Sequence, residues 1–176
     1  MSIKNKIVSP EQLVEKQGAK LLVYGAAGAG KTKLCATAPG KVLVLSAEAG
    51  LLSIRDAKNV DAVELKEAAE VMEFHKALDT GELQYDTVCL NHEKSKSKDA
   101  RQAYMEVQNS VTNVMRAFRD LQMNVIFICK MDKTVVENSV TFEPKMVGAK
   151  LGQAITYFFD EVLALRVIED QDEEGN

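Results

Sequence analysis

Blocks of apolar residues, separated by polar ones, divide this chain of 176 residues into short regular elements. Four blocks are apolar almost without interruption, which is typical of strands covered on both faces of a sheet. These strands are predicted over residues 20–24, 41–45, 86–90 and 124–129. Weaker patterns predict strands over 61–65 and 161–168, and a hairpin over 134–142 that turns at Asn138 and Ser139.

Between the strands, apolar residues recur every three or four positions, as they do along one face of a helix. The longest such pattern covers residues 100–121, and shorter helices are predicted over 9–14, 31–38, 67–78 and 151–159. Because helices alternate with continuously apolar strands, we predict an α/β fold with an open, mainly parallel sheet. Ligands bind to such sheets beyond the carboxyl ends of the strands.

The composition is that of an ordinary soluble domain, with 46% apolar and 27% charged residues. No apolar run approaches the roughly 18 residues of a membrane span, and the first residues lack the pattern of a secretory signal. We therefore expect a cytoplasmic protein without a membrane partner. The net charge of −4 argues against a protein whose whole surface binds nucleic acid, although it is compatible with a local basic patch.

Residues 1–176 are predicted to form a single domain, in which three segments differ from the rest. Residues 1–18 precede the first strand, residues 91–99 form a mobile basic loop, and residues 169–176 form an acidic, frayed tail. Four basic side chains cluster in or beside the loop. They are either contacts to DNA phosphates or a solvated loop tip: Lys94, Lys96, Lys98 and Arg101.

The first strand runs directly into GAAGAGKT, which matches the phosphate-loop pattern G-x-x-x-x-G-K-[ST]. Small residues let backbone N–H groups approach phosphate oxygens, and the following helix presents its first amides to the anion. We expect Lys31 to reach the β- and γ-phosphates of ATP or ADP, and Thr32 to place its hydroxyl on Mg²⁺. The predicted nucleotide-binding residues are Gly25, Ala26, Ala27, Gly28, Ala29, Gly30, Lys31, Thr32 and Lys33.

Catalytic residues are expected where other strands end. Hydrolysis needs a group that orients water beside the γ-phosphate, and a carboxylate just past a strand adjoining the phosphate-loop strand could do this. Glu48 follows the second strand, either in this role or as a solvated loop residue. Lys130 follows the fourth strand, either as a group that senses the γ-phosphate or as a lysine that extends into solvent.

Several stretches resemble known families. GAAGAGKT followed by KVLVLSAEAG is similar to the RecA-type ATPase core, in which the glutamate after this strand activates water. YDTVCL, DARQAYMEVQNSVTNVMRAFRDL, VIFICKMDKT and GAKLGQAITYFFDEVLALRV resemble the AAA-domain nucleotide-binding proteins of phages, which are single-domain RecA-like ATPases. Some members of that family anneal single-stranded DNA.

This resemblance implies a three-layer RecA-like P-loop NTPase core, with a mainly parallel sheet and a C-terminal extension of a β-hairpin and a strand. It also implies an ATPase stimulated by single-stranded DNA that works in annealing or recombination, beside a single-strand DNA-binding protein. The implied assembly is a homo-oligomeric ring or filament, in the cytoplasm of a bacterial host. In such assemblies basic residues of a neighbouring subunit complete the ATP site, and Lys145 or Lys150 are candidates for this role.

The sequence departs from the family pattern at Asn91. ATPases of this kind usually end a buried strand with an aspartate that holds Mg²⁺ through water, whereas the third strand here is followed by Asn91. Either Asn91 is a weak neutral substitute, or the natural chain carries a further segment between Leu90 and Asn91. The two histidines, His75 and His92, lack ligand-type neighbours and are expected at the surface.

Two other functions compete with the DNA-linked ATPase. One is a nucleotide-binding regulator or packaging-type ATPase that does not touch DNA, against which Glu48 argues because a switch need not hydrolyse quickly. The other is a kinase for a small acceptor, which is disfavoured because no arginine-rich lid lies between the third and fourth strands.

Overall fold

The computed structural model describes residues 9–11, 17–47, 50–91, 102–136, 139–146, 151 and 154–168. The strands form one seven-stranded sheet in the order β3-β2-β4-β5-β1-β7, and β6 pairs with β5 beyond this path. All pairs along the path are parallel, whereas β5 and β6 are antiparallel. The strands are β1 (Lys20–Gly25), β2 (Val42–Ser46), β3 (Val60–Glu64), β4 (Thr87–Asn91), β5 (Asn124–Val136), β6 (Ser139–Pro144) and β7 (Glu161–Leu165).

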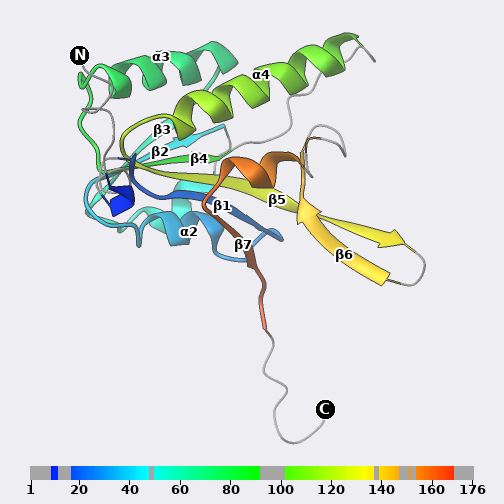
Figure 1. Ribbon diagram of the computed structural model, residues 1–176. Coiled ribbons are helices and arrows are strands. Elements are labelled where there is room, and N and C mark those ends of the chain that lie inside the picture. The colour runs from blue at the N-terminus through cyan, green and yellow to red at the C-terminus, as the bar shows by residue number, and fades with distance from the viewer. Residues whose placement is uncertain are drawn as a thin grey trace, which may run out of the picture.

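Helices cover both faces of this sheet and make three layers (Figure 1). The helices α3 (Ala68–Asp79) and α4 (Gln102–Arg119) lie on one face, together with the short 3₁₀ helix η3 (Thr156–Phe158). The other face carries α2 (Lys31–Cys35) and the 3₁₀ helix η2 (Gly50–Ile54). The predicted α/β fold with a mainly parallel sheet is therefore confirmed.

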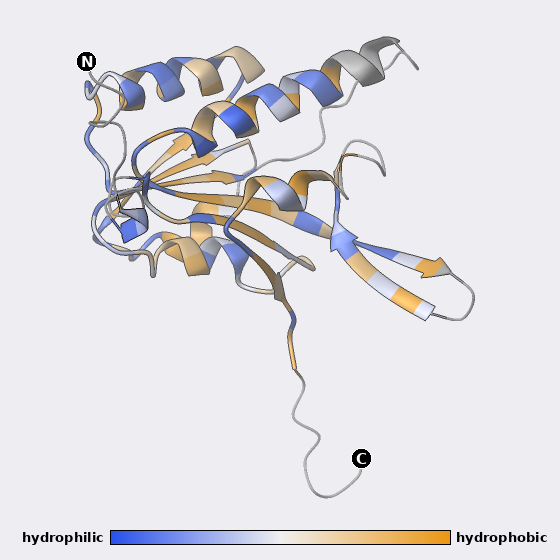
Figure 2. Cartoon of the chain, in the orientation of Figure 1, coloured by the Kyte–Doolittle hydropathy of each residue, from blue (hydrophilic) through white to orange (hydrophobic). Residues whose placement is uncertain are grey.

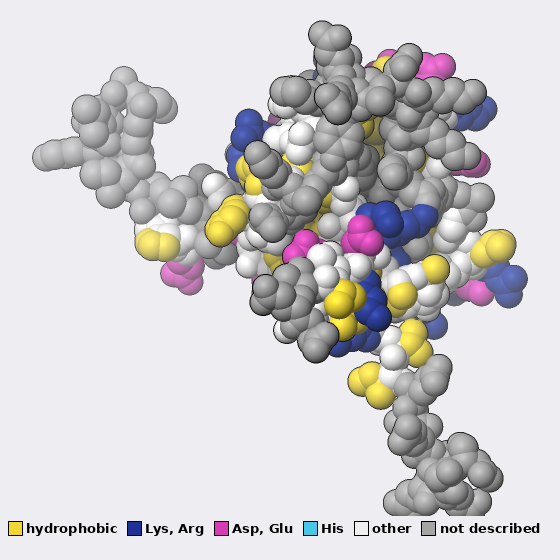
Figure 3. All heavy atoms as spheres, turned by 90° about the vertical axis from the view of Figure 1, so that its right-hand side faces the viewer, with side chains coloured by type: hydrophobic (Ala, Val, Ile, Leu, Met, Phe, Trp, Pro, Cys, Tyr) yellow, Lys and Arg dark blue, Asp and Glu magenta, His cyan; other side chains and the backbone are white. Residues whose placement is uncertain are grey.

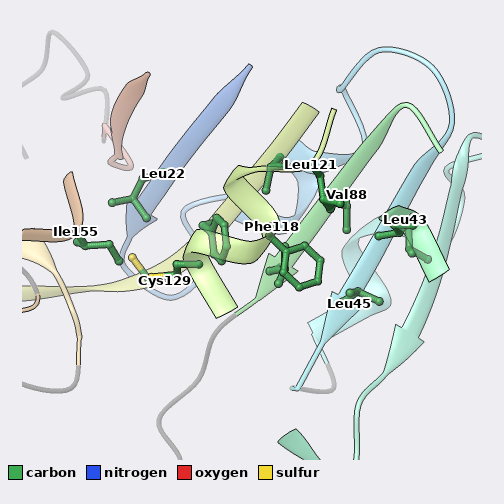
Figure 4. Close-up of a cluster of buried hydrophobic side chains, with 13 residues drawn as sticks. Leu22, Leu43, Leu45, Val88, Phe118, Leu121, Cys129 and Ile155 are labelled. Carbon is green, nitrogen blue, oxygen red and sulfur yellow. The ribbon is translucent and has the colours of Figure 1, made fainter. Parts of the chain in front are cut away.

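The continuous apolar strands supply a core to each face, because successive side chains point to opposite sides of a sheet. Leu43 and Leu45 of β2 join the core under α3 and α4, whereas Val42 and Val44 join the core under α2. Figure 2 shows the central strands in the hydrophobic colour, and Figure 4 shows the larger core around Phe118. Each central strand is therefore packed into a hydrophobic core on both of its faces.

Aromatic rings link the helices to the sheet within the larger core. Phe118 of α4 lies edge-on to Phe127 of β5, with ring centroids 6.5 Å apart, and Phe127 meets Phe159 at 5.2 Å. His75 of α3 also packs edge-on against Phe118, and its Nε2 lies 3.1 Å from the carbonyl oxygen of Ala117. The expectation that His75 is a surface residue was wrong, because the imidazole fills the contact between α3 and α4.

A buried lysine occupies the first position of β1. Lys20 is only 5% exposed, and its ammonium group donates to the carbonyl oxygens of Leu121 (2.8 Å), Met123 (2.5 Å) and Gln17. Burial lowers the pKa of Lys20, while the negative charges of Asp160 and Asp120 act against this. The side chain thus ties the start of β1 to the loop between α4 and β5.

Several predicted bounds differ from the structure. The helix expected over 31–38 ends at Cys35, and the residues that follow form a turn. β7 ends at Leu165, where a strand to Ile168 was expected. Val136 pairs with Ser139, so Ser139 belongs to β6 and not to the turn of the hairpin. In the helix expected over 9–14, Pro10 and Glu11 are helical and residues 12–14 lie outside the described part.

Candidate nucleotide-binding site

The phosphate-loop sequence lies at the carboxyl edge of the sheet, where β1 ends between β5 and β7. Gly25, the first residue of the phosphate loop, is also the last residue of β1; residues 26–30 connect it to α2, which begins at Lys31. Across the sheet, Gly25 pairs with Lys130 of β5 on one side and with Leu165 of β7 on the other. This placement agrees with the expected position of a ligand at the ends of parallel strands.

The glycines of the loop have two different reasons to be glycine. A Cβ atom on Gly25 would lie 2.6 Å from the carbonyl oxygen of Leu165, so the neighbouring strand leaves no room for one. Gly28 and Gly30 have φ values of 78° and 86°, a left-handed conformation that side chains disfavour. A Cβ atom on either of these two would meet nothing within 4 Å, so the space over the loop is open.

Lys31 lies folded over the mouth of the loop. Its ammonium group donates to the carbonyl oxygens of Gly25 (2.9 Å) and Ala26 (2.7 Å). Partial burial lowers the pKa of the Lys31 amine; the neighbouring Cys129 acts against this lowering, and the positive charge of Lys130 adds to it. The ammonium is therefore held at the loop by neutral carbonyl oxygens, which an anionic phosphate would outcompete because charge-assisted hydrogen bonds are stronger.

Cys129 of β5 is near enough to Lys31 to interact with it electrostatically, and it is 1% exposed in the larger core. Burial raises the pKa of its thiol to about 12, although the positive charge of Lys31 opposes the rise. A thiol with this pKa stays protonated at neutral pH, and thiols react as thiolates. Cys129 thus serves as apolar packing in the larger core.

Lys130 does not end its strand, contrary to the prediction. β5 continues through Lys130 to Val136 and forms the hairpin with β6. The parallel pairing with β1 nevertheless stops at the pair of Gly25 and Lys130, so this exposed lysine lies next to the first residue of the loop. The predicted position beside the phosphates is therefore consistent with the register.

Lys145 follows β6 and lies beside Lys130. Its backbone N–H donates to the carbonyl oxygen of Lys130 at 2.7 Å, and its ammonium group lies 3.6 Å from Asp132. Both partners of this ion pair are about half exposed, so the contact adds little stability. Lys150, the other basic candidate for a neighbouring site, lies outside the described residues.

Asn91 ends β4, two strands away from the phosphate loop. Its side-chain amide donates to the hydroxyl oxygen of Ser46 at 3.4 Å, and the pairing with β5 places it opposite Ile128. Its amide oxygen is a possible ligand for Mg²⁺, since this metal prefers oxygen ligands. Within the described ranges, no group of three or more acidic, histidine or cysteine side chains could hold a metal ion.

Glu48 lies outside the described residues, as do Lys94, Lys96, Lys98 and Arg101. The strand that precedes Glu48 does not adjoin the phosphate-loop strand, because β4 and β5 lie between β2 and β1. That part of the sequence argument was wrong. The order of parallel strands depends on where the connecting helices cross, and the apolar pattern of a strand does not encode it.

Sequence reasoning missed a contact between β6, β1 and β7 beside the loop. The Tyr24 hydroxyl, one residue before the loop, donates to the carbonyl oxygen of Phe142 at 3.3 Å. The guanidinium of Arg166 packs over the Phe142 ring, 4.5 Å from its centroid. Arg166 could have been found only if β7 had been placed next to β1.

The fold and the loop together define a P-loop nucleotide-binding domain of the RecA-like α/β class. A family model described as AAA domain matches residues 17–175, and the chain belongs to this family. The crystal structure of the RadB recombinase has a similar fold. It has a TM-score of 0.55 and 15% identity, and the match covers 85% of this chain and 74% of that one. No curated protein matches the chain.

Proposed function

We propose that this domain binds ATP as its Mg²⁺ complex through residues 25–33 and hydrolyses it. The observation that supports this most strongly is the empty space over the loop between β1 and α2, with the Lys31 ammonium held beside it by the carbonyl oxygens of Gly25 and Ala26. On binding, Lys31 would exchange two carbonyl oxygens for phosphate oxygens. The empty space over Gly28 and Gly30 would let the same phosphates approach backbone N–H groups of the loop.

The metal site in this proposal is sparse. Thr32 is partly buried at the start of α2 and offers the hydroxyl that phosphate-loop proteins place on Mg²⁺. Asn91 offers a neutral amide oxygen where related ATPases have a carboxylate. Magnesium would depend chiefly on the phosphates and Thr32 for its ligands.

For hydrolysis, we assign Glu48 to orient the attacking water and Lys130 to sense the γ-phosphate. The assignment of Glu48 is supported by its place in the sequence, two residues after the end of β2, and by the resemblance to the RecA-type core. The assignment of Lys130 is supported by its register opposite Gly25. A cation at this position would stabilise negative charge on the transferring phosphate.

We further propose that the domain works on single-stranded DNA in annealing or recombination, as a phage protein in the cytoplasm of a bacterial host. It would act beside a single-strand DNA-binding protein and as a homo-oligomeric ring or filament. The support comes from the family, from a structural neighbour that is a recombinase, and from the basic cluster from Lys94 to Arg101. Figure 3 shows basic and acidic side chains interspersed on the side of the molecule toward which the hairpin projects, so the described part of this side is not uniformly basic.

The deciding experiment measures ATP hydrolysis with and without single-stranded DNA. Lys31→Ala should abolish hydrolysis and weaken nucleotide binding, whereas Lys58→Ala, an exposed lysine on the loop before β3, should change neither. Stimulation by DNA that disappears in Lys31→Ala would support the whole proposal. Hydrolysis that is indifferent to DNA would keep the ATPase and reject the DNA role.

The second candidate is a nucleotide-dependent switch that binds ATP without appreciable turnover. It is favoured by one observation, the neutral Asn91 at the position of the metal-binding carboxylate. In this case ATP binds tightly and the rate of hydrolysis stays at the level of Lys31→Ala. Asn91→Asp would then raise the rate, since it restores a charged ligand for the metal.

A further inference from the structure

Apolar side chains are exposed near both edges of the sheet. β7 forms one edge and β3 the other, since each pairs with a single strand of the described sheet. Val162 and Leu163 of β7 are more than a third exposed, which is unusual for apolar residues in a sheet whose central strands are fully buried. Such an edge presents a surface to which another chain can bind.

Beyond β7 the chain leaves the sheet and carries two further apolar side chains into solvent. Val167 is 68% exposed and Ile168 is 86% exposed. Figure 1 shows this stretch extending away from the body, and Figure 3 shows hydrophobic side chains along it. Arg166 precedes the two apolar residues, and Glu169 and Asp170 follow them in the sequence.

A groove of about 470 Å³ lies at the opposite edge, between η2 and β3. Its lining is largely apolar and includes Leu52, which is 79% exposed. Two charged side chains, Arg55 and Glu64, also line it.

The groove cannot receive the Val167–Ile168 stretch of the same chain. Four strands separate β3 from β7, and neighbouring strands lie about 4.8 Å apart, so the two edges are about 24 Å from one another. Val167 lies only two residues beyond the end of β7, which spans about 7 Å of extended chain. The occupant therefore has to come from a second molecule.

We propose that Val167 and Ile168 of one copy dock in the groove of the next copy. Glu64 of the receiving copy would face Arg166, so one pair of opposite charges would lie beside the apolar contact. The contact joins two different surfaces and is therefore heterologous, which generates a ring if it closes and a filament if it does not. The contact rests on the ring or filament proposed above and is independent of ATP hydrolysis.

The test uses two single-cysteine variants, Leu52→Cys and Ile168→Cys, which are mixed and treated with a short bis-maleimide. Both positions are exposed, so the variants should fold, and the native cysteines Cys35, Cys89 and Cys129 are buried and should not react. The mixture should form a crosslinked dimer of the two variants at least tenfold faster than either variant alone. Tyr157→Cys, at a position 89% exposed outside the groove, serves as the matched control when mixed with Ile168→Cys.

Equal crosslinking of Leu52→Cys and Tyr157→Cys with Ile168→Cys would overturn the proposal. Faster crosslinking of Leu52→Cys with itself would also overturn it, because that result marks a symmetric interface. A second measurement uses sedimentation velocity without nucleotide, in which Ile168→Asp should weaken self-association at least tenfold and Val140→Asp, on the hairpin, should not. Lys31→Ala should assemble like the unmodified protein, so a failed ATPase assay leaves this result interpretable.

Discussion

Replacing Gly25 by alanine tests how the phosphate loop is attached to the sheet. The new Cβ atom would lie 2.6 Å from the Leu165 carbonyl oxygen, and ordinary contact begins at 3.4 Å. β7 would have to move by about 0.8 Å, which is the difference between these two distances. The obstacle is backbone, so no side chain can rotate to relieve it, and overpacking of this kind costs about 1–3 kcal/mol.

The assay is urea unfolding in the absence of nucleotide, with thermal unfolding beside it. For a chain of this length, a loss of about 2 kcal/mol corresponds to a fall in Tm of roughly 4–8 °C. Gly28→Ala is the matched control: it meets no atom within 4 Å, but its φ of 78° costs about 1–2 kcal/mol in the left-handed region. Gly28→Asn should recover most of this cost because asparagine tolerates that conformation, whereas Gly25→Asn should not recover stability.

A Gly25→Ala variant as stable as the unmodified protein would refute the reasoning, since it would mean that β7 does not press on the loop. The same conclusion would follow if Gly25→Asn were more stable than Gly25→Ala. The comparison separates two reasons for a glycine, close approach of another strand and backbone conformation, that the sequence pattern alone treats as one.

Three further predictions concern the site and the core. Burial lowers the pKa of Lys31 and a bound phosphate raises it, so nucleotide binding takes up a proton when the pH lies above the pKa of the free protein. Nucleotide affinity, measured by fluorescence titration, should therefore fall as the pH rises through that pKa. Lys31→Arg should show a flatter pH profile. Lys130→Ala should lower the turnover number and leave nucleotide affinity nearly unchanged; unchanged turnover would remove it from the catalytic assignment. Phe118→Ala should reduce the free energy of unfolding by about 3–5 kcal/mol in urea titrations, because it empties the centre of the larger core, and a loss under 1 kcal/mol would contradict that placement.

The layers of the fold could be predicted because local sequence patterns encode them. Each central strand is continuously apolar, and this pattern already requires cover on both faces. The phosphate loop could be placed for a similar reason, since the strand before it and the helix after it are both local. The start of β1 and the start of α2 agree with the prediction.

The strand order and the neighbours of the loop could not be predicted, because they depend on contacts between distant residues. Nothing in residues 161–165 shows that β7 pairs with β1, and therefore Arg166 was missed. The extension of β5 beyond Lys130 was also missed, since polar residues after an apolar strand usually mark its end. η2 was not predicted because its five residues carry no regular period.

Strand β5 belongs both to the parallel sheet and to the hairpin, so the alternation of side chains in one is tied to that in the other. Its first half, up to Lys130, is paired in parallel with β1, and its second half is one arm of the hairpin. Side chains alternate between the two faces along the whole strand, so the number of residues after Lys130 decides to which face each hairpin side chain points. Inserting one residue after Lys130 would turn Val135 to the opposite face, whereas inserting two would lengthen the arm and preserve its orientation. The hairpin can thus vary in length between relatives in steps of two residues per arm while it presents the same face.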